Sequence, residues 1–153
     1  DNLSTASVTT SPAFVFENGK QAYDLPDGFV EYGLGFNGEL GKERTNLPSA
    51  DSLIEKLIEP LLIDLQLKEG DEIAVFLNVF QATTTLEECI LLYSLQNALK
   101  RKKIKVFDTF VQSLFPTQGA GGLSLSFLKM QEEYRGFYKK EAYSPLFYKR
   151  EME

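Results

Sequence analysis

A glycine-rich segment holds the residues whose types and spacing could do chemistry. It runs from Glu31 to Gly41 and reads EYGLGFNGELG. Its glycines allow either a tight turn with positive φ or a close approach of the backbone to a ligand, and the spacing alone leaves both open. Asn37 carries an amide that can donate and accept hydrogen bonds. Glu39 is either a solvated loop carboxylate or a group that orients Asn37 or a ligand hydroxyl. The spacing does not fit a dinucleotide fingerprint.

The composition limits what chemistry this segment can support. The 153 residues include no histidine and a single cysteine, Cys89. A Ser-His-Asp triad, a Cys-His pair and a histidine or cysteine zinc site within this chain are therefore excluded. One cysteine cannot form an intrachain disulfide, which favours a reducing compartment, so we expect a cytoplasmic protein. Cys89 itself is expected to be a small buried hydrophobe.

Charge and length define the class of protein further. The net charge of −6 disfavours nonspecific binding to nucleic acid or to an anionic membrane. No apolar run approaches the ~20 residues that a membrane span needs, and the first ten residues lack the basic region of a signal peptide. A chain of this length predicts one domain with a real core. Because it does not start with Met, we expect either processing or a piece of a longer protein.

Hydrophobic periodicity predicts the elements that must position the glycine-rich segment. Strands are expected over residues 13–16, 29–36, 72–80, 104–115 and 123–130, and helices over residues 49–67, 83–102 and 132–138. Residues 1–10 and 37–48 are expected to be loops. The strands at 72–80 and 104–115 flank a helix, so they should pair in parallel, and the strand at 123–130 should be an antiparallel partner. The order predicts an α/β (α+β) domain with a mixed sheet and helices mainly on one face.

Several local signals refine this scheme. Ser52 with Glu55 is a candidate capping box, and Pro60 should kink or split its helix. The residues 83–85 offer N-caps for the next helix, whose basic end at 100–103 is expected to be a capping, solvated face. Lys42 and Arg44 are also expected to be solvated surface.

Two other segments leave alternatives open. Residues 115–122, FPTQGAGG, are either a long flexible hairpin loop or a nest of backbone amides that binds an anion. Residues 131–153 are rich in aromatic and basic side chains, but acidic residues dilute the charge. Packing of these rings on the domain or on a partner is therefore favoured over binding of single-stranded nucleic acid.

The glycine-rich segment resembles the E-x-G-x-G-x-H-G-E-P-G segment of the dihydroxyacetone-binding (K) subunit of dihydroxyacetone kinases. Further segments resemble the same subunit in the same order, and these are Thr5–Pro12, Glu72–Asn78, Ser113–Leu114 with Ala120–Lys129, and Glu141–Pro145. The resemblance implies that residues 1–153 form a single domain equivalent to the C-terminal domain of that subunit, with the N-terminal domain absent. It also implies a two-layer fold with a mixed sheet of about six strands and a homodimer.

The resemblance points to substrate-binding residues, and the sequence departs from it at one of them. The implied positions are Gly35, Asn37, Gly38 and Glu39. Asn37 stands where the family has the histidine that captures dihydroxyacetone covalently as a hemiaminal. The lone pair of an amide nitrogen is delocalised into its carbonyl, so Asn37 cannot be that nucleophile. No residue is therefore assigned a catalytic role, and no metal site is expected.

Two functions follow from the resemblance. One is part of a dihydroxyacetone (glycerone) kinase in glycerol metabolism, which positions dihydroxyacetone for phosphoryl transfer and is not active as an isolated domain. In that case the phosphoryl donor and Mg belong to a nucleotide-binding partner subunit, and this domain carries no cofactor. The other is a non-catalytic paralogue that senses a small carbonyl compound and acts through a regulator protein. Neither function involves nucleic acid or a membrane.

Overall fold

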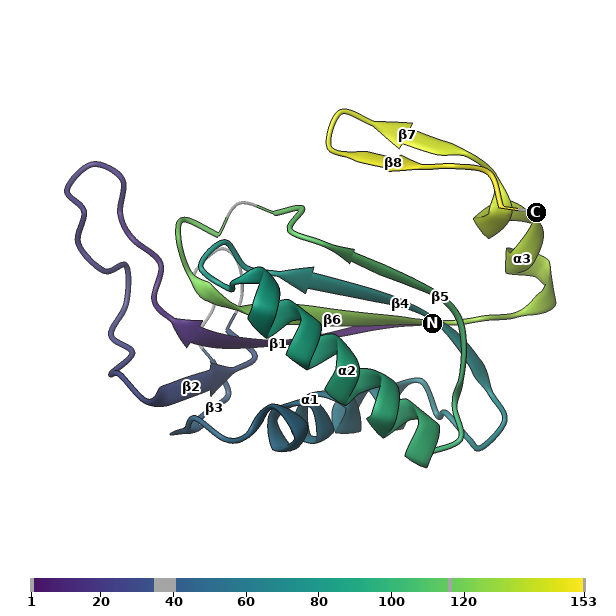
Figure 1. Ribbon diagram of the computed structural model, residues 1–153, viewed down its shortest axis with the longest axis horizontal. Helices are drawn as coiled ribbons and strands as arrows, with labels where there is room; N and C mark the ends of the chain where they lie inside the picture. The colour runs from purple at the N-terminus through teal and green to yellow at the C-terminus, as the bar shows by residue number, and fades with distance from the viewer. Residues whose placement is uncertain (1, 35–40, 116, 153) are drawn as a thin grey trace.

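The chain folds around one mixed sheet. The computed structural model describes residues 2–34, 41–115 and 117–152, and every structural statement below concerns these. Their elements, in chain order, are β1 (Leu3–Ser11), β2 (Phe29–Tyr32), β3 (Glu43–Asn46), α1 (Ala50–Asp64), β4 (Glu72–Val79), α2 (Thr85–Arg101), β5 (Lys105–Gln112), β6 (Gly121–Lys129), α3 (Glu132–Lys139), β7 (Ala142–Ser144) and β8 (Phe147–Lys149). The six-stranded sheet has the order β3-β2-β1-β6-β4-β5, and β7 and β8 form a separate hairpin (Figure 1).

The strand pairings confirm the predicted mixed sheet. β4 and β5 pair in parallel around α2, as the βαβ pattern predicts. β6 is antiparallel, as expected, but its neighbours are β1 and β4 rather than β5. A central place suits β6 because Leu123, Leu125 and Phe127 on one of its faces are all fully buried. Burial of that face outweighs the short connection that would pair β6 with β5.

The first strand corrects the prediction that residues 1–10 form a loop. β1 is central and pairs with both β2 and β6. Its threonines suit an extended backbone, and only Ala6 and Val8 face the hydrophobic core. The predicted loop at 37–48 likewise contains the polar edge strand β3, whereas residues 13–16 make only the single bridge Phe14↔Gln21. Hydrophobicity therefore identified the wrong segment as the first strand.

Helices α1 and α2 cover one face of the sheet (Figure 1). The cap of α1 is Ser49, which accepts from the Ser52 backbone N–H, so the predicted box of Ser52 with Glu55 is wrong. Pro60 does not split the helix, and it lies exposed on the solvent side. The prediction for α2 is confirmed, since Thr84 and Glu87 form a complete capping box.

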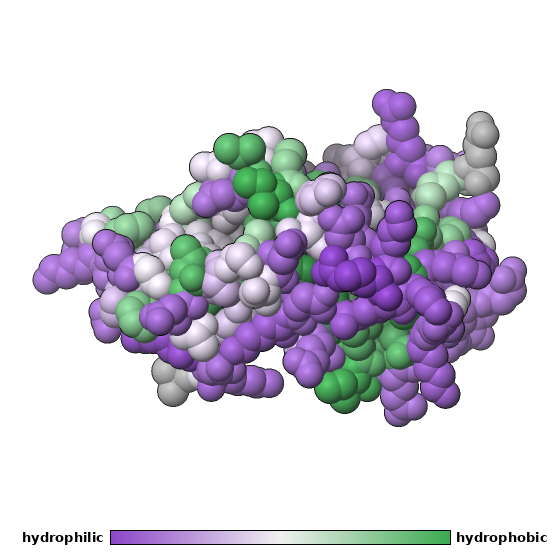
Figure 2. Space-filling view, turned by 60° about the horizontal axis from the view of Figure 1, so that its bottom comes forward, coloured by the Kyte–Doolittle hydropathy of each residue, from purple (hydrophilic) through white to green (hydrophobic). Residues whose placement is uncertain are grey.

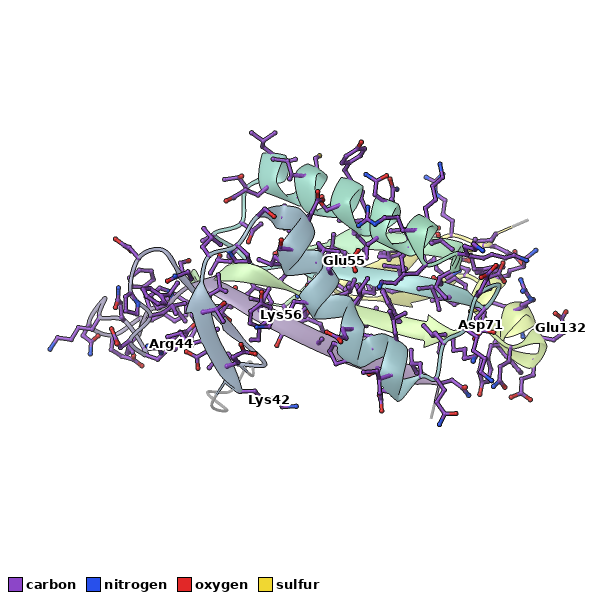
Figure 3. All side chains as sticks on the ribbon, turned by 90° about the horizontal axis from the view of Figure 1, so that it is seen from below. Lys42, Arg44, Glu55, Lys56, Asp71 and Glu132 are labelled. Atoms are coloured by element: carbon purple, nitrogen blue, oxygen red, sulfur yellow. The ribbon has the colours of Figure 1, made fainter. Side chains whose placement is uncertain are left out.

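Charged side chains connect the two helices at the surface. The Glu55 carboxylate lies 2.7 Å from Arg101 and 3.2 Å from Lys102, which joins α1 to the end of α2. The hydrogen bond from Arg101 is the main reason that the pKa of Glu55 lies below its usual value. Figure 3 shows Glu55 and Lys56 on α1, between Arg44 at one end of the sheet and Asp71 at the other. The predicted solvated basic end of α2 is thus partly engaged in ion pairs.

The outer surface of the helix layer is only sparsely hydrophobic. Purple side chains divide its hydrophobic surface into separate patches (Figure 2). The large exposed hydrophobic residues of α1 and α2 are Ile63, Leu86, Ile90 and Tyr93. Cys89 is exposed too, so its prediction as a buried hydrophobe is wrong, because the core-facing side of α2 runs through Leu91, Leu95 and Leu99 instead. Within the described residues, no helix has the length and hydropathy to cross a bilayer.

Candidate functional site

The connection between β2 and β3 carries the predicted substrate-binding residues. Gly35, Asn37, Gly38 and Glu39 lie outside the described residues, so the structure places only the two ends of this connection. At those ends the Gly33 N–H donates to the Ser7 carbonyl oxygen, and the Lys42 N–H donates to that of Tyr32, both at 2.8 Å. The connection therefore starts and finishes on a fixed sheet edge.

A carboxylate and a guanidinium fix the exit of this connection. Glu31 Oε2 accepts from Arg44 Nε at 3.0 Å and from Arg44 Nη2 at 2.7 Å, while Glu31 Oε1 accepts from the Gly41 N–H at 3.2 Å. A Cβ on Gly41 would lie 2.3 Å from Glu31 Cγ, so glycine is required there while Glu31 keeps its place. Arg44 Nη2 also donates to the Asp24 carbonyl oxygen at 2.6 Å. Such a charge-assisted fork fixes geometry more strongly than a single neutral hydrogen bond.

This fork corrects the prediction that Arg44 is simply solvated surface. Glu31 and Arg44 are directly opposite in the register of β2 and β3, where opposite charges attract. The two opposite charges are visible in the sequence, but their pairing can be predicted only if β3 is known to be a strand. Lys42, in contrast, has no ion-pair partner among the described carboxylates.

The described start of the connection, at Leu34, lies toward the face that α1 and α2 do not cover. Val8 faces the core, so its neighbour Ser7 points to the opposite face. Ser7 Oγ donates to the Leu34 carbonyl oxygen at 3.1 Å, which places that carbonyl on the same side. Thr5 and Ser126 lie further along this face, with their hydroxyl oxygens 2.8 Å apart.

Tyr32 lies at the root of the connection but on the helix side. It is buried, and its hydroxyl has no hydrogen-bond partner among the described residues. Lys56 Nζ lies 4.5 Å from the centre of its ring. Burial raises the pKa of Tyr32, so the phenol stays protonated and packs as part of the core.

The second glycine-rich segment does not form an anion nest in its described part. The Gly119 N–H donates to Gln81 Oε1 at 2.9 Å, and the Gly121 N–H donates to Ser11 Oγ at 2.8 Å. The Gly122 N–H donates to Thr83 Oγ1 at 2.8 Å. These amides already have acceptors, so they are not available to bind an anion. The same bonds tie the segment to the end of β4, which is more order than a flexible hairpin loop would have.

The arrangement offers hydrogen bonds and a fixed backbone, without a nucleophile or a metal centre that can be assigned. Among the described residues, no group of three histidine, cysteine, aspartate or glutamate side chains could hold a metal ion. Sequence order, sheet order and the βαβ unit together define a two-layer α/β domain of the kind that the sequence resemblance implied.

Comparison with known proteins identifies the family. The Dak1 domain family matches residues 1–146, and the chain therefore belongs to it. It is 30% identical over 132 residues to the dihydroxyacetone-binding subunit DhaK of PTS-dependent dihydroxyacetone kinase 1 from Listeria innocua. That match covers 86% of this chain and 40% of the relative, so the chain spans less than half of the relative's length.

Solved structures share the fold. The dihydroxyacetone kinase operon co-activator Dha-DhaQ superimposes with a TM-score of 0.81 at 20% identity, over 91% of this chain and 43% of the co-activator. The dihydroxyacetone kinase from C. freundii superimposes with a TM-score of 0.72 at 19% identity, over 92% of this chain and 26% of the kinase. At these identities the likeness shows a common fold, shared by a regulator and an enzyme.

Proposed function

We propose that this chain forms part of a dihydroxyacetone-binding protein that holds dihydroxyacetone, or a similar small carbonyl compound, without a covalent bond. The observation that carries the proposal is Asn37, at the position of the family's capturing histidine, in a chain that contains no histidine. The end of its loop at Gly41 is held by Glu31, which also binds Arg44, and this fixed end supports the proposal.

Non-covalent binding leaves phosphoryl transfer chemically open. An amide at Asn37 can hydrogen-bond to the ketone oxygen or to a hydroxyl of the ligand, and Glu39 can accept from another hydroxyl. Positioning and electrostatics provide most of the catalysis in phosphoryl transfer. The proposal therefore assigns ligand positioning to Gly35, Asn37, Gly38 and Glu39, and assigns the phosphoryl donor and its Mg to a nucleotide-binding partner subunit.

A regulatory paralogue is the second candidate. The same substitution at Asn37 supports it, because a sensor needs binding without turnover. The fold likeness supports it as well, since the solved structure with that fold is described as a co-activator of the dihydroxyacetone kinase operon. In this case the domain would report a small carbonyl compound to a protein partner, as a cytoplasmic homodimer.

Turnover by the full-length gene product separates the two candidates. It would be mixed with dihydroxyacetone, a nucleotide-binding partner subunit and a phosphoryl donor, and dihydroxyacetone phosphate would be measured. Wild type would be compared with Asn37→His, and with Asn46→His on the exposed edge strand as a matched control. Turnover by wild type supports the kinase subunit. Turnover by Asn37→His alone, or by neither protein, supports the regulator.

The absence of covalent capture has its own test. Dihydroxyacetone labelled with ¹³C at the carbonyl carbon would keep its ketone signal when bound to wild type, and would lose it to a tetrahedral carbon signal when a hemiaminal forms. We expect the ketone signal with wild type and with Asn46→His. A tetrahedral signal with wild type would contradict the proposal.

A further inference from the structure

The C-terminal segment docks on the sheet face that the helices leave open. The Tyr138 hydroxyl donates to Asp108 Oδ2 of β5 at 2.9 Å, and Arg135 pairs with Glu72 at the start of β4. The ring of Phe147 lies 4.8 Å from that of Phe110. Figure 1 shows α3 beyond the end of the sheet opposite to β2 and β3, with the β7–β8 hairpin extending back over β5.

A cavity of about 400 Å³ lies between this segment and the sheet. Its size falls within the range of roughly 300–1,000 Å³ that is common for small-molecule sites. The hydrophobic side chains that dominate its lining are Leu3, Phe76, Phe110, Leu128, Phe137 and Phe147. The proposed carbonyl-compound site uses none of these residues, so this cavity needs a different occupant.

The charged groups of the cavity indicate the sign of that occupant. Lys140 and Lys149 both line it, and their Nζ atoms each lie 5.2 Å from the centre of a ring, that of Phe137 and that of Tyr138 respectively. The two ammonium groups thus lie beside consecutive residues of α3. Neither forms an ion pair with a carboxylate among the described residues.

The nearby carboxylates already have partners. Glu141 also lines the cavity and hydrogen-bonds to the Tyr148 hydroxyl, and Asp108 accepts from Tyr138. Lys149 Nζ donates to the Arg150 carbonyl oxygen at 3.4 Å, which leaves its charge in place. The two ammonium groups therefore outnumber the one lining carboxylate, Glu141, and leave a net positive charge at the apolar cavity. A ligand that complements this arrangement has an aliphatic part and a single negative charge.

We propose that this cavity binds a linear aliphatic monocarboxylate, with the chain against Phe76 and Phe110 and the carboxylate at Lys140 and Lys149. The site is independent of the carbonyl-compound site, because it lies on α3, the β7–β8 hairpin and the facing strands rather than on the β2–β3 connection. The proposed occupant is a free amphiphile. The alternative occupant, which the experiments below distinguish, is a second copy of this chain bound to the same face.

Binding of decanoate, octanoate and decan-1-ol to the full-length gene product tests the proposal. Titration calorimetry should give saturable binding of one decanoate per chain. Octanoate, two methylenes shorter, should bind about 15-fold more weakly, since each methylene changes affinity about fourfold, or about 0.8 kcal/mol. Decan-1-ol should bind more weakly than decanoate, by about fivefold or more.

Variants locate the binding. Ser126→Leu and Ala74→Leu each place a larger side chain in the cavity lining and should weaken decanoate binding at least 20-fold. Lys140→Met with Lys149→Met should bring decanoate down to the affinity of decan-1-ol and leave the alcohol unchanged. Lys100→Met, on the exposed side of α2, is the matched control and should bind as wild type. Far-UV circular dichroism and thermal melting show which variants are folded.

Three results would overturn the proposal. The first is no saturable decanoate binding to the folded wild type. The second is binding that neither cavity-filling variant weakens while both remain folded, since the site would then lie elsewhere. The third is a dimer in sedimentation that Ser126→Leu dissociates and decanoate does not, which would make a second copy of the chain the occupant. Each can occur whether or not dihydroxyacetone binds at the β2–β3 connection.

Discussion

The two faces of the sheet are built from the same strands but differ in composition and burial. On the helix side, β4 and the middle of β6 present aliphatic and aromatic residues that are almost completely buried, and these are Ile73, Val75, Leu77, Val79, Leu123, Leu125 and Phe127. On the other face, Ser7 contacts the start of the glycine-rich connection, while Phe76, Phe110 and Ser126 lie under the C-terminal segment. The alternation of strand residues therefore commits one face to stability and leaves the other free to bind ligands.

The largest expected effect distinguishes the two faces on a single strand. Leu125→Ala, on the helix side of β6, should lower the free energy of unfolding by about 3 kcal/mol, because a buried leucine leaves a cavity that the core cannot fill. Leu128→Ala, half-buried beside the cavity, should cost about 1 kcal/mol. Urea denaturation of both variants provides the measurement. Equal losses would show that the second face is as tightly packed as the first.

A backbone contact that belongs to neither face should have the next largest effect. Gly122 has a φ of +129°, and a Cβ there would lie 2.2 Å from the Val8 carbonyl oxygen of β1. Gly122→Ala should cost about 2 kcal/mol, because the strands must separate as well as strain. Gly70→Ala is the matched control, since its φ is +90° with nothing within 4 Å of the added carbon. It should cost about 1 kcal/mol, and a Gly122→Ala loss no larger than this would contradict the steric argument.

The helix layer should respond to the loss of a cap. Thr84→Ala removes the side-chain part of the capping box, in which Thr84 Oγ1 accepts from the Glu87 N–H at 3.3 Å and donates to the Glu87 carboxylate at 2.7 Å, and should cost about 1 kcal/mol. Ser49→Ala removes an equally long bond from the Ser52 N–H, but the Ser49 hydroxyl donates to the neutral Ser52 Oγ rather than to a carboxylate, so this variant should cost less. Thermal unfolding of the two variants measures the difference. A larger loss at Ser49 would indicate that α1, rather than α2, holds the layer on the sheet.

The smallest effect concerns the C-terminal segment and depends on pH. Burial, followed by the hydrogen bond to the Asp108 carboxylate, raises the pKa of Tyr138 above its ordinary value of 10.0. The folded state therefore binds more protons than the unfolded state above about pH 10, and stability falls as pH rises further. The slope from this residue cannot exceed about 1.4 kcal/mol per pH unit, and because Tyr138 is only half-buried we expect less than about 1 kcal/mol between pH 9 and pH 11. Urea denaturation at pH 9 and pH 11 should show that the free energy of unfolding decreases less for Tyr138→Phe than for wild type. Identical decreases for the two proteins would contradict this prediction.

The sequence predicted those elements whose local signals agree with their surroundings. The nearly continuous apolar run at 72–80 contains β4, and Thr84 with Glu87 marks the start of α2. β1 escaped prediction because its polar residues face an open side of the sheet, so its alternation has few apolar members. β3 was not predicted because an edge strand can be entirely polar, and hydrophobic periodicity does not detect such a strand.

The candidate site was predictable only in part, for a related reason. The motif around Asn37 points to a ligand-binding connection, since glycine spacing is a local property of the sequence. The fork of Glu31 and Arg44 depends on the pairing of two strands, one of them unforeseen. The apolar cavity depends on how residues from β4, β5 and the C-terminal segment meet, and no local pattern reports such a meeting.

The place of β1 has a consequence for how the chain reaches its fold. Thr5 and Ser126, 121 residues apart in sequence, meet across the pairing of β1 with β6. Closing so long a loop costs conformational entropy, and this cost precedes the stabilisation that the β1–β6 pairing provides. Topologies with such long-range pairings fold slowly. During synthesis β1 can pair with β2 early, but its other edge must stay unpaired until β6 has been made. We therefore expect the β1–β6 pairing to be a late event, and β1 to be the segment most exposed to aggregation before it occurs.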